Sequence, residues 1–132
     1  MISAKTLRPA IAAIALFAIG ATGAWAQDKI TVTSEKPVAA ADVPADAVVV
    51  GIEKMKYLTP EVTIKAGETV YWVNGEVMPH NVAFKKGIVG EDAFRGEMMT
   101  KDQAYAITFN EAGSYDYFCT PHPFMRGKVI VE

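Results

Sequence analysis

Short segments rich in β-branched and aromatic residues, separated by Gly, Pro and Asn, constrain the fold of this chain most strongly. The clearest segment is TVYWVN at 69–74, in which Val70 and Trp72 fall on one face and Tyr71 and Val73 on the other. Alternation with a period of two predicts a strand, and no long helical segment separates this strand from the others. Further strands are expected at 29–33, 48–52, 61–65, 81–85, 104–109, 115–119 and 128–131. Together they predict an all-β domain, folded as an antiparallel sandwich or barrel.

Two stretches of the chain do not follow this strand pattern. Residues 34–47, SEKPVAAADVPADA, show no sustained period and predict an irregular connection. Residues 88–103 are the least regular part, with room for a helical turn. Tyr117, two residues before Cys119, occupies the place of the tyrosine corner that is typical of Greek-key sandwiches, although an ordinary half-buried strand tyrosine fits equally well.

The N-terminal segment 1–26 is typical of an export signal. Two basic residues near the start precede an uncharged, mostly apolar run at 10–21, and Ala-Trp-Ala at 24–26 offers a cleavage site between small residues. A retained membrane anchor is the alternative, but this run is rich in Ala and less apolar than the roughly 20 residues that a span requires. We therefore expect residues 1–26 to be a cleaved signal peptide and 27–132 to be a single exported domain.

The charge balance bears on the partners of the chain. Loss of the signal peptide would remove Lys5 and Arg8 and leave 11 basic and 15 acidic residues, a formal charge of −4. A mildly acidic chain without a long basic run argues against nucleic acid as a partner. We expect a monomer that has no membrane contact after cleavage.

The stretch YFCTPHPFM at 117–125 contains the only cysteine of the chain, Cys119, followed by His122 and Met125 in the spacing Cys-x-x-His-x-x-Met. One cysteine cannot form an internal disulfide, so a thiol in an exported protein must be deeply buried, reactive or bound to a metal. The three residues lie between two expected strands, on one tight loop that cannot enclose an ion alone. His80, far upstream of this loop, is the only other histidine and completes a candidate site of four ligands.

The residue types of this candidate site select the metal. A structural zinc site normally has four Cys or His ligands, whereas a thiolate with a thioether is a soft pair that favours copper. Two His and one Cys in a trigonal plane with a weak axial Met is the arrangement of blue-copper electron-transfer sites. Each residue has an ordinary alternative: a buried core cysteine, a loop histidine, or a methionine that fills space in the core. Their joint spacing and strand context favour copper, which would hold the only thiol as a coordinated thiolate.

Two other functions use the same residues. A nucleophilic Cys–His enzyme would need Cys119 open to substrate and His80 or His122 free as a base. Met125 has no role in acyl transfer, and a small sandwich leaves little room for a cleft, so we do not expect an enzyme. A copper delivery or storage protein would favour an open, exchangeable site, whereas this one is expected to be closed by two loops.

Residues 48–132 resemble the cupredoxins, the family of small blue-copper proteins. The resemblance is carried by AGETVYWVN (66–74), MPHNV (78–82), EAGSYDYFC (111–119) and CTPHPFMRGKVIVE (119–132). The Cys-x-x-His-x-x-Met loop is similar to that of the amicyanin group, whereas plastocyanin- and pseudoazurin-like proteins place His and Met two residues further apart. The family implies a Greek-key β-sandwich of about eight to nine strands.

The resemblance also implies the ligands and the function. His80, Cys119 and His122 would be the equatorial ligands of one copper ion, which alternates between Cu(II) and Cu(I), and Met125 would be the axial ligand. The implied role is that of a periplasmic one-electron carrier between a quinone-cofactor amine (methylamine) dehydrogenase and a c-type cytochrome. A pseudoazurin- or plastocyanin-like carrier that serves another redox enzyme is the alternative.

Residues around the ligands are expected to support the site and its partners. Asn81 is expected to link the two ligand loops, and Pro121 to withhold an amide donor from the thiolate. The family implies an apolar docking patch around the edge of His122. Its matching residues are Met55, Met78, Pro79, Met98, Pro121, Pro123 and Phe124. The nearby charges that could steer a partner are Lys85, Lys86, Arg95 and Arg126.

Overall fold

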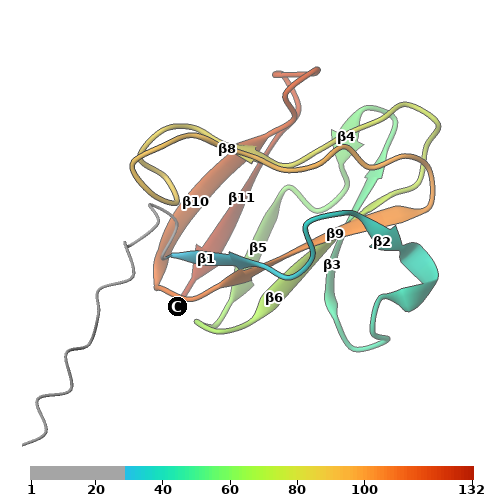
Figure 1. Ribbon diagram of the computed structural model, residues 1–132. Helices are drawn as coiled ribbons and strands as arrows, with labels where there is room; N and C mark the ends of the chain where they lie inside the picture. The colour runs from blue at the N-terminus through green and yellow to red at the C-terminus, as the bar shows by residue number, and fades with distance from the viewer. Residues whose placement is uncertain (1–28) are drawn as a thin grey trace, which may run out of the picture.

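The strands form two sheets (Figure 1), and alternate apolar positions along them are buried in one core. The structure, a computed structural model, describes residues 29–132, so the signal peptide expected at 1–26 lies outside the described residues. In chain order the elements are β1 (Ile30–Val32), β2 (Val38–Ala39), the 3-10 turn η1 (Ala40–Asp42), β3 (Val48–Glu53), β4 (Lys56–Tyr57), β5 (Glu61–Ile64), β6 (Thr69–Asn74), β7 (Ala83–Phe84), β8 (Phe94–Arg95), β9 (Gln103–Phe109), β10 (Gly113–Phe118) and β11 (Arg126–Val131). One sheet has the order β1-β9-β6-β3-β4, with β2 also paired to β9, and the other has the order β5-β11-β10-β7-β8. Within residues 29–132, no helix is long and apolar enough to cross a membrane.

The predicted all-β sandwich is confirmed, with eleven strands in place of about eight to nine. The three strands that the sequence did not indicate are β2, β4 and β8, and each has only two residues, too few to show a period of two. The expectation of a wholly antiparallel sandwich is wrong at two pairs, because β3 runs parallel to β6 and β5 runs parallel to β11. Between the members of each parallel pair the chain crosses to the other sheet, so no hairpin can join them.

The two irregular stretches and one predicted strand also differ from expectation. The connection at 34–47 contains β2 and η1, and 88–103 contains β8 in place of a helical turn. The strand expected at 81–85 is reduced to β7, because the backbone of His80 pairs with Met99 in an isolated bridge before β7 begins. His80 therefore lies in a loop that is pinned by its own hydrogen bonds, and it does not start the strand.

A cluster of aromatic rings fills the space between the sheets. Trp72 and Tyr117 meet edge to face with ring centroids 5.2 Å apart, and Tyr117 meets Tyr57 in the same way at 4.8 Å. Phe84 and Phe109 are also buried, with 1% and 0% of their surfaces exposed. Burying each such side chain contributes about 1.5–3 kcal/mol, so this cluster anchors β10, the strand that leads to Cys119.

The tyrosine corner is present, but at a different residue from the one considered. Tyr115 donates its hydroxyl to the carbonyl of Glu111 at 2.6 Å, four residues upstream in the turn before β10. The hydroxyl of Tyr117 is buried and has no hydrogen-bond partner among residues 29–132. Tyr117 is therefore a core side chain, because alternation along β10 points both tyrosines inward and only Tyr115 reaches the turn.

Candidate metal centre

The loop between β10 and β11 carries three of the four predicted ligands, and two consecutive turns fix its shape. The N–H of His122 donates to the carbonyl of Cys119 at 3.2 Å, and the N–H of Met125 donates to the carbonyl of His122 at 2.9 Å. The N–H of Cys119 donates to the carbonyl of Met125 at 3.2 Å and closes the base of the loop. The loop extends from the end of the sandwich farthest from the C-terminus (Figure 1).

The loop that carries His80 is held by hydrogen bonds from both sides. The N–H of His80 donates to the carbonyl of Met99 at 3.2 Å, and the N–H of Met99 donates back at 2.8 Å. The buried amide of Asn74 donates to the carbonyls of Met78 and Met99, each at 2.9 Å. These bonds fix the backbone immediately before and beside His80.

The structure brings the two loops together so that three donor atoms face one another. The sulfur of Cys119 lies 3.7 Å from Nδ1 of His80 and 3.6 Å from Nδ1 of His122, and all three atoms lie within 4.8 Å of one another. A metal with bonds of about 2.1 Å to nitrogen and about 2.3 Å to sulfur, at trigonal angles, would hold S and N about 3.8 Å apart. The observed spacing therefore fits a shared metal ion.

The burial of these residues suits a site closed to water. Cys119 and His80 have no exposed surface, Met125 is 3% exposed, and His122 is half-buried. Burial raises the pKa of the Cys119 thiol, and the backbone N–H groups of Asn81 and His122 act in the opposite direction. A thiol in this position therefore favours its protonated form until a metal replaces the proton.

Asn81 lies between the two ligand loops. Its Nδ2 donates to the hydroxyl of Thr120 at 3.0 Å and to the carbonyl of Gly96 at 3.1 Å, and its Oδ1 accepts from the N–H of Thr120 at 2.9 Å. Tyr57 donates its hydroxyl to the carbonyl of Asn81 at 2.6 Å. The fully buried Asn81 side chain thus joins the His80 loop to the residue that follows Cys119.

Sequence reasoning missed Glu76, which contacts the only ring nitrogen of His80 that does not face Cys119. Partial burial acts to raise the pKa of Glu76, but hydrogen bonds from His80 and from the backbone N–H groups of Met55 and Lys54 outweigh it and hold this pKa below its ordinary value. Glu76 is therefore a carboxylate at neutral pH. A carboxylate shortly before a histidine in a loop has no diagnostic spacing, so the sequence offered no signal for this contact.

Exposed apolar residues lie beside the two ligand histidines in the chain, and one of them contacts the half-buried ring of His122. Phe124 is 69% exposed and its ring lies 6.1 Å from that of His122, centroid to centroid. The rings of His80 and His122 are 4.9 Å apart, so the loops that carry them adjoin. Of the predicted docking residues, Met78, Pro79, Pro121, Pro123 and Phe124 are exposed, and Met55 and Met98 are half-buried. Val77, which is 81% exposed, was missed because one exposed Val in a loop is unremarkable in a sequence.

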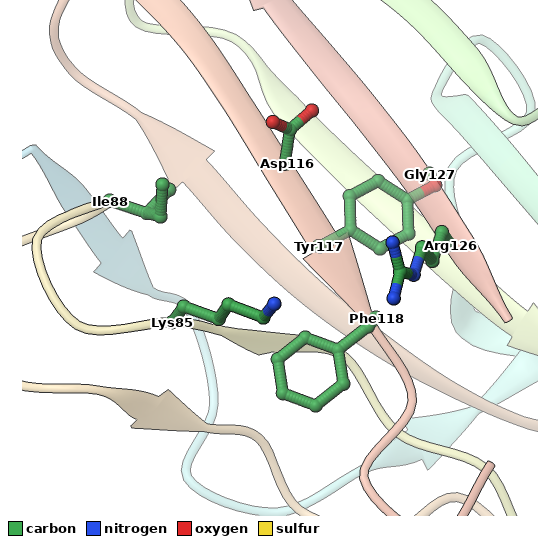
Figure 2. Close-up of a pocket in the computed structure, with 7 residues that line it drawn as sticks. All are labelled: Lys85, Ile88, Asp116, Tyr117, Phe118, Arg126 and Gly127. Carbon is green, nitrogen blue, oxygen red and sulfur yellow. The ribbon is translucent and has the colours of Figure 1, made fainter. Parts of the chain in front are cut away.

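A hollow of about 310 Å³ lies on the sheet that carries β10 and β11. Phe118 and Arg126 line it, and as register partners they also mark the base of the ligand loop. Figure 2 shows the side chains of Lys85 and Arg126 near the ring of Phe118, with Asp116 further along β10. Asp116 pairs with Lys128 at 3.7 Å, and among residues 29–132 neither Lys85 nor Arg126 forms an ion pair. Two cations without an ion-pair partner among residues 29–132 therefore line a hollow at the base of the ligand loop.

A two-sheet β-sandwich with a Cys, two His and a buried Met gathered at one end defines a blue-copper protein of the cupredoxin type. Residues 44–132 match the family of copper binding proteins described as the plastocyanin/azurin family, and the chain belongs to this family. It is therefore a copper-dependent electron carrier and not an enzyme.

Amicyanins are among its relatives. The chain is 61% identical to amicyanin of Paracoccus denitrificans over the full length of both chains. It is 48% identical to amicyanin-alpha of Methylorubrum extorquens over 91% of this chain and 95% of that one. The reduced Cu(I) form of an amicyanin mutant at pH 4 matches the structure with a TM-score of 0.78 and 62% identity, over 80% of this chain and 100% of that chain.

Proposed function

We propose that His80, Cys119 and His122 hold one copper ion in a plane and that Met125 supplies a weak axial ligand. The observation that carries this proposal is the convergence of two imidazole Nδ1 atoms on one buried sulfur, at 3.7 Å for His80 and 3.6 Å for His122. When bound, copper would supply a one-electron Cu(II)/Cu(I) couple.

The protein would contribute rigidity and a route to the surface. Three sets of backbone and side-chain hydrogen bonds would hold the donor atoms in place. They are the consecutive turns of the Cys119 loop, the His80–Met99 bridge and the Asn81–Thr120 bonds. A site held in this way reorganises little when its charge changes, which favours fast electron transfer. The half-buried ring of His122 offers the route, because Cys119 and His80 are fully enclosed.

We propose that the mature chain begins after Ala26 and works in the periplasm as a monomer. As the electron donor we propose a quinone-cofactor amine dehydrogenase, with methylamine dehydrogenase as the specific case, and as the acceptor a c-type cytochrome. Full-length similarity to amicyanin supports this assignment over a plastocyanin- or pseudoazurin-like carrier for another enzyme. The buried ligands argue against copper delivery or storage, which would favour an open site.

Partners would dock on the apolar residues around His122. Small, weakly bound interfaces are typical of redox encounters, and the exposed Met78, Pro121, Pro123 and Phe124 suit one. Lys85 and Arg126 would steer an acidic partner toward this end of the molecule.

Absorption spectroscopy of the copper-loaded protein tests the ligand assignment. We expect an intense band near the red end of the visible spectrum, caused by charge transfer from the thiolate. Cys119→Ser should abolish the band, and Met125→Ala should shift it while the equatorial ligands remain. Met78→Ala is the matched control, because this methionine is 48% exposed, and its spectrum should equal the wild type. A blue band retained in Cys119→Ser would contradict the assignment.

A further inference from the structure

The outer face of the sheet that carries β10 and β11 has an aromatic residue beside a cation. Along β10, Tyr115 and Tyr117 are buried in the core, so the alternate residues Asp116 and Phe118 lie on the opposite, outer face. Arg126 of β11 is the register partner of Phe118, and residues directly opposite each other in an antiparallel pair share a face. Phe118 and Arg126 are therefore neighbours on this outer face.

A tight turn after β7 brings a second cation to the same place. The N–H of Ile88 donates to the carbonyl of Lys85 at 3.2 Å, and Gly87, the third residue of the turn, has a φ of 88° that favours glycine. The turn holds Lys85 and Ile88 close together at its two ends. Both residues line the hollow of about 310 Å³ that Phe118 and Arg126 also line.

The two cations of this hollow face the same apolar surface. In Figure 2 the charged ends of Lys85 and Arg126 lie near the ring of Phe118. Nε of Arg126 donates to the carbonyl of Pro123 at 3.3 Å, which restrains the guanidinium at the base of the ligand loop. Within residues 29–132, neither cation forms an ion pair. Both charges are therefore available to a ligand in the hollow.

The remaining lining determines what kind of ligand fits. Asp116 is the acidic residue of the lining, and its ion pair with Lys128 at 3.7 Å offsets its charge. Phe118 and Ile88 are half-buried and supply apolar surface. The volume lies at the lower end of the range of about 300–1,000 Å³ that is typical of ligand clefts. A matching ligand is therefore small, negatively charged at one end and apolar at the other.

We propose that this hollow binds a small organic carboxylate with an aromatic body. The carboxylate would accept hydrogen bonds from Lys85 and Arg126, because charge-assisted hydrogen bonds are the strongest that these side chains form. The aromatic body would lie on Phe118 and Ile88. An inorganic anion would leave the apolar surface without a contact, and a neutral aromatic compound would leave both cations without a partner.

A bound carboxylate would also affect association with a redox partner. It would offset the charges of Lys85 and Arg126, which we propose steer an acidic partner. This consequence rests on the proposed function, whereas binding of the carboxylate does not.

The first experiment is an NMR titration of the reduced, copper-loaded protein with benzoate at constant ionic strength. We expect saturable shifts of the amide resonances of Lys85, Ile88, Phe118 and Arg126. Acetate, which lacks the aromatic body, and benzyl alcohol, which lacks the charge, should each bind several-fold more weakly than benzoate. Equal affinity for benzoate and acetate, or no saturable shift at these four residues, would overturn the proposal.

Substitutions test whether the two cations hold the carboxylate. Lys85→Ala and Arg126→Ala should each weaken benzoate binding about two- to fivefold, which is the range for an exposed ion pair, and the double variant should weaken it further. Lys65→Ala is the matched control, because Lys65 is an exposed cation just after β5 and does not line the hollow, and it should retain wild-type affinity. Wild-type affinity in a folded double variant would contradict the assignment of these residues.

The second experiment measures the rate at which an amine dehydrogenase reduces the protein. At fixed ionic strength, benzoate should slow the wild type more than the same concentration of acetate does, and it should have little effect on the Lys85→Ala/Arg126→Ala double variant. An unchanged wild-type rate at saturating benzoate would overturn the connection to partner association. If the dehydrogenase failed to reduce the protein although benzoate bound in the hollow, the proposed electron donor would be wrong and the carboxylate site would stand.

Discussion

Two buried polar atoms, Nε1 of Trp72 and the hydroxyl oxygen of Tyr117, have no hydrogen-bond partner among residues 29–132. A buried group without a partner costs about 1–3 kcal/mol relative to a satisfied one. Both rings nevertheless lie at the centre of the aromatic cluster, where their apolar surfaces pack edge to face. For each residue, the free energy gained by burying the apolar surface of the ring exceeds the cost of its one unpaired polar atom. Tyr117 also directs β10 toward Cys119, so its packing supports the metal centre.

Replacement of Tyr117 by Phe tests whether this hydroxyl is indeed unpaired. Burial raises the pKa of Tyr117 to about 12 in the folded protein, against a smaller lowering by the neighbouring side chain of Trp72, whereas an unfolded tyrosine ionises at about 10. Between these values the folded state binds more protons, so stability is fully present below about pH 10 and is lost as the pH rises toward about 12. Tyr117→Phe should be neutral within about 1 kcal/mol at pH 7, because the lost atom had no partner. Between pH 10 and 11, the free energy of unfolding of metal-free Tyr117→Phe, measured in urea, should fall less than that of the wild type. A loss at pH 7 well above the roughly 1 kcal/mol that a typical hydrogen bond contributes would reveal a partner at this hydroxyl.

The β10–β11 hairpin is the element that presents the ligand loop. Its register pairs Phe118 with Arg126 and Tyr117 with Gly127, so the loop begins and ends on paired residues. A Cβ at Gly127 would lie 2.3 Å from Cζ and Oη of Tyr117, far inside van der Waals contact. The hairpin therefore lies against the buried ring only because residue 127 has no side chain.

Gly127→Ala should consequently destabilise the protein through overpacking. Substitutions that force extra methyl groups into a packed core cost about 1–3 kcal/mol, and this contact is severe enough to expect the upper end. Lys128→Ala on the same strand should cost less than about 0.5 kcal/mol, since that side chain is 41% exposed. The penalty should shrink in a Tyr117→Leu background, which removes the atoms that clash. Additive effects of the two substitutions in urea unfolding would show that the ring is not the cause.

At the scale of elements, periodicity in the sequence indicated all strands of three or more residues, because only these display alternation. It did not indicate β2, β4 and β8, which depend on pairing with a neighbour rather than on their own pattern. It left Tyr117, two residues before Cys119, as either the tyrosine corner or an ordinary strand tyrosine, and only the geometry of the preceding turn selects Tyr115 as the corner. Glu76 stayed hidden as well, because two of its partners belong to the separate turn at Lys54 and Met55, and its spacing from His80 within their shared loop is not diagnostic.

At the scale of the molecule, the candidate metal centre joins two loops that are distant in the chain, one at His80 and one from Cys119 to Met125. The residue types of its four members were predictable because chemistry limits which side chains bind copper. Their convergence depends on the stacking of two sheets and on Asn81, whose bonds to Thr120 connect the loops. The surface around the site follows from the same arrangement. Pro121, Pro123 and Phe124, which flank His122 in the loop, are exposed, and Lys85 and Arg126 line the hollow at the base of the loop.

The formal charge of the mature chain and the charges of Lys85 and Arg126 have opposite signs, and the role of these two cations can be tested. The mature chain would carry a formal charge of −4, whereas Lys85 and Arg126, which form no ion pair within residues 29–132, line the hollow beside Phe118 at the base of the ligand loop. If they steer an acidic partner, the rate of electron transfer from an amine dehydrogenase should fall as ionic strength rises, since charges are screened beyond about 10 Å at 0.1 M salt. Arg126→Ala should lower the rate at low salt and flatten its salt dependence, without altering the copper spectrum. Lys36→Ala, an exposed cation in the 34–47 connection, is the matched control and should retain the wild-type profile. Stopped-flow kinetics of the wild type, Arg126→Ala and Lys36→Ala across a range of salt concentrations test this prediction. A wild-type electron-transfer rate that does not depend on salt would contradict electrostatic steering by these two cations.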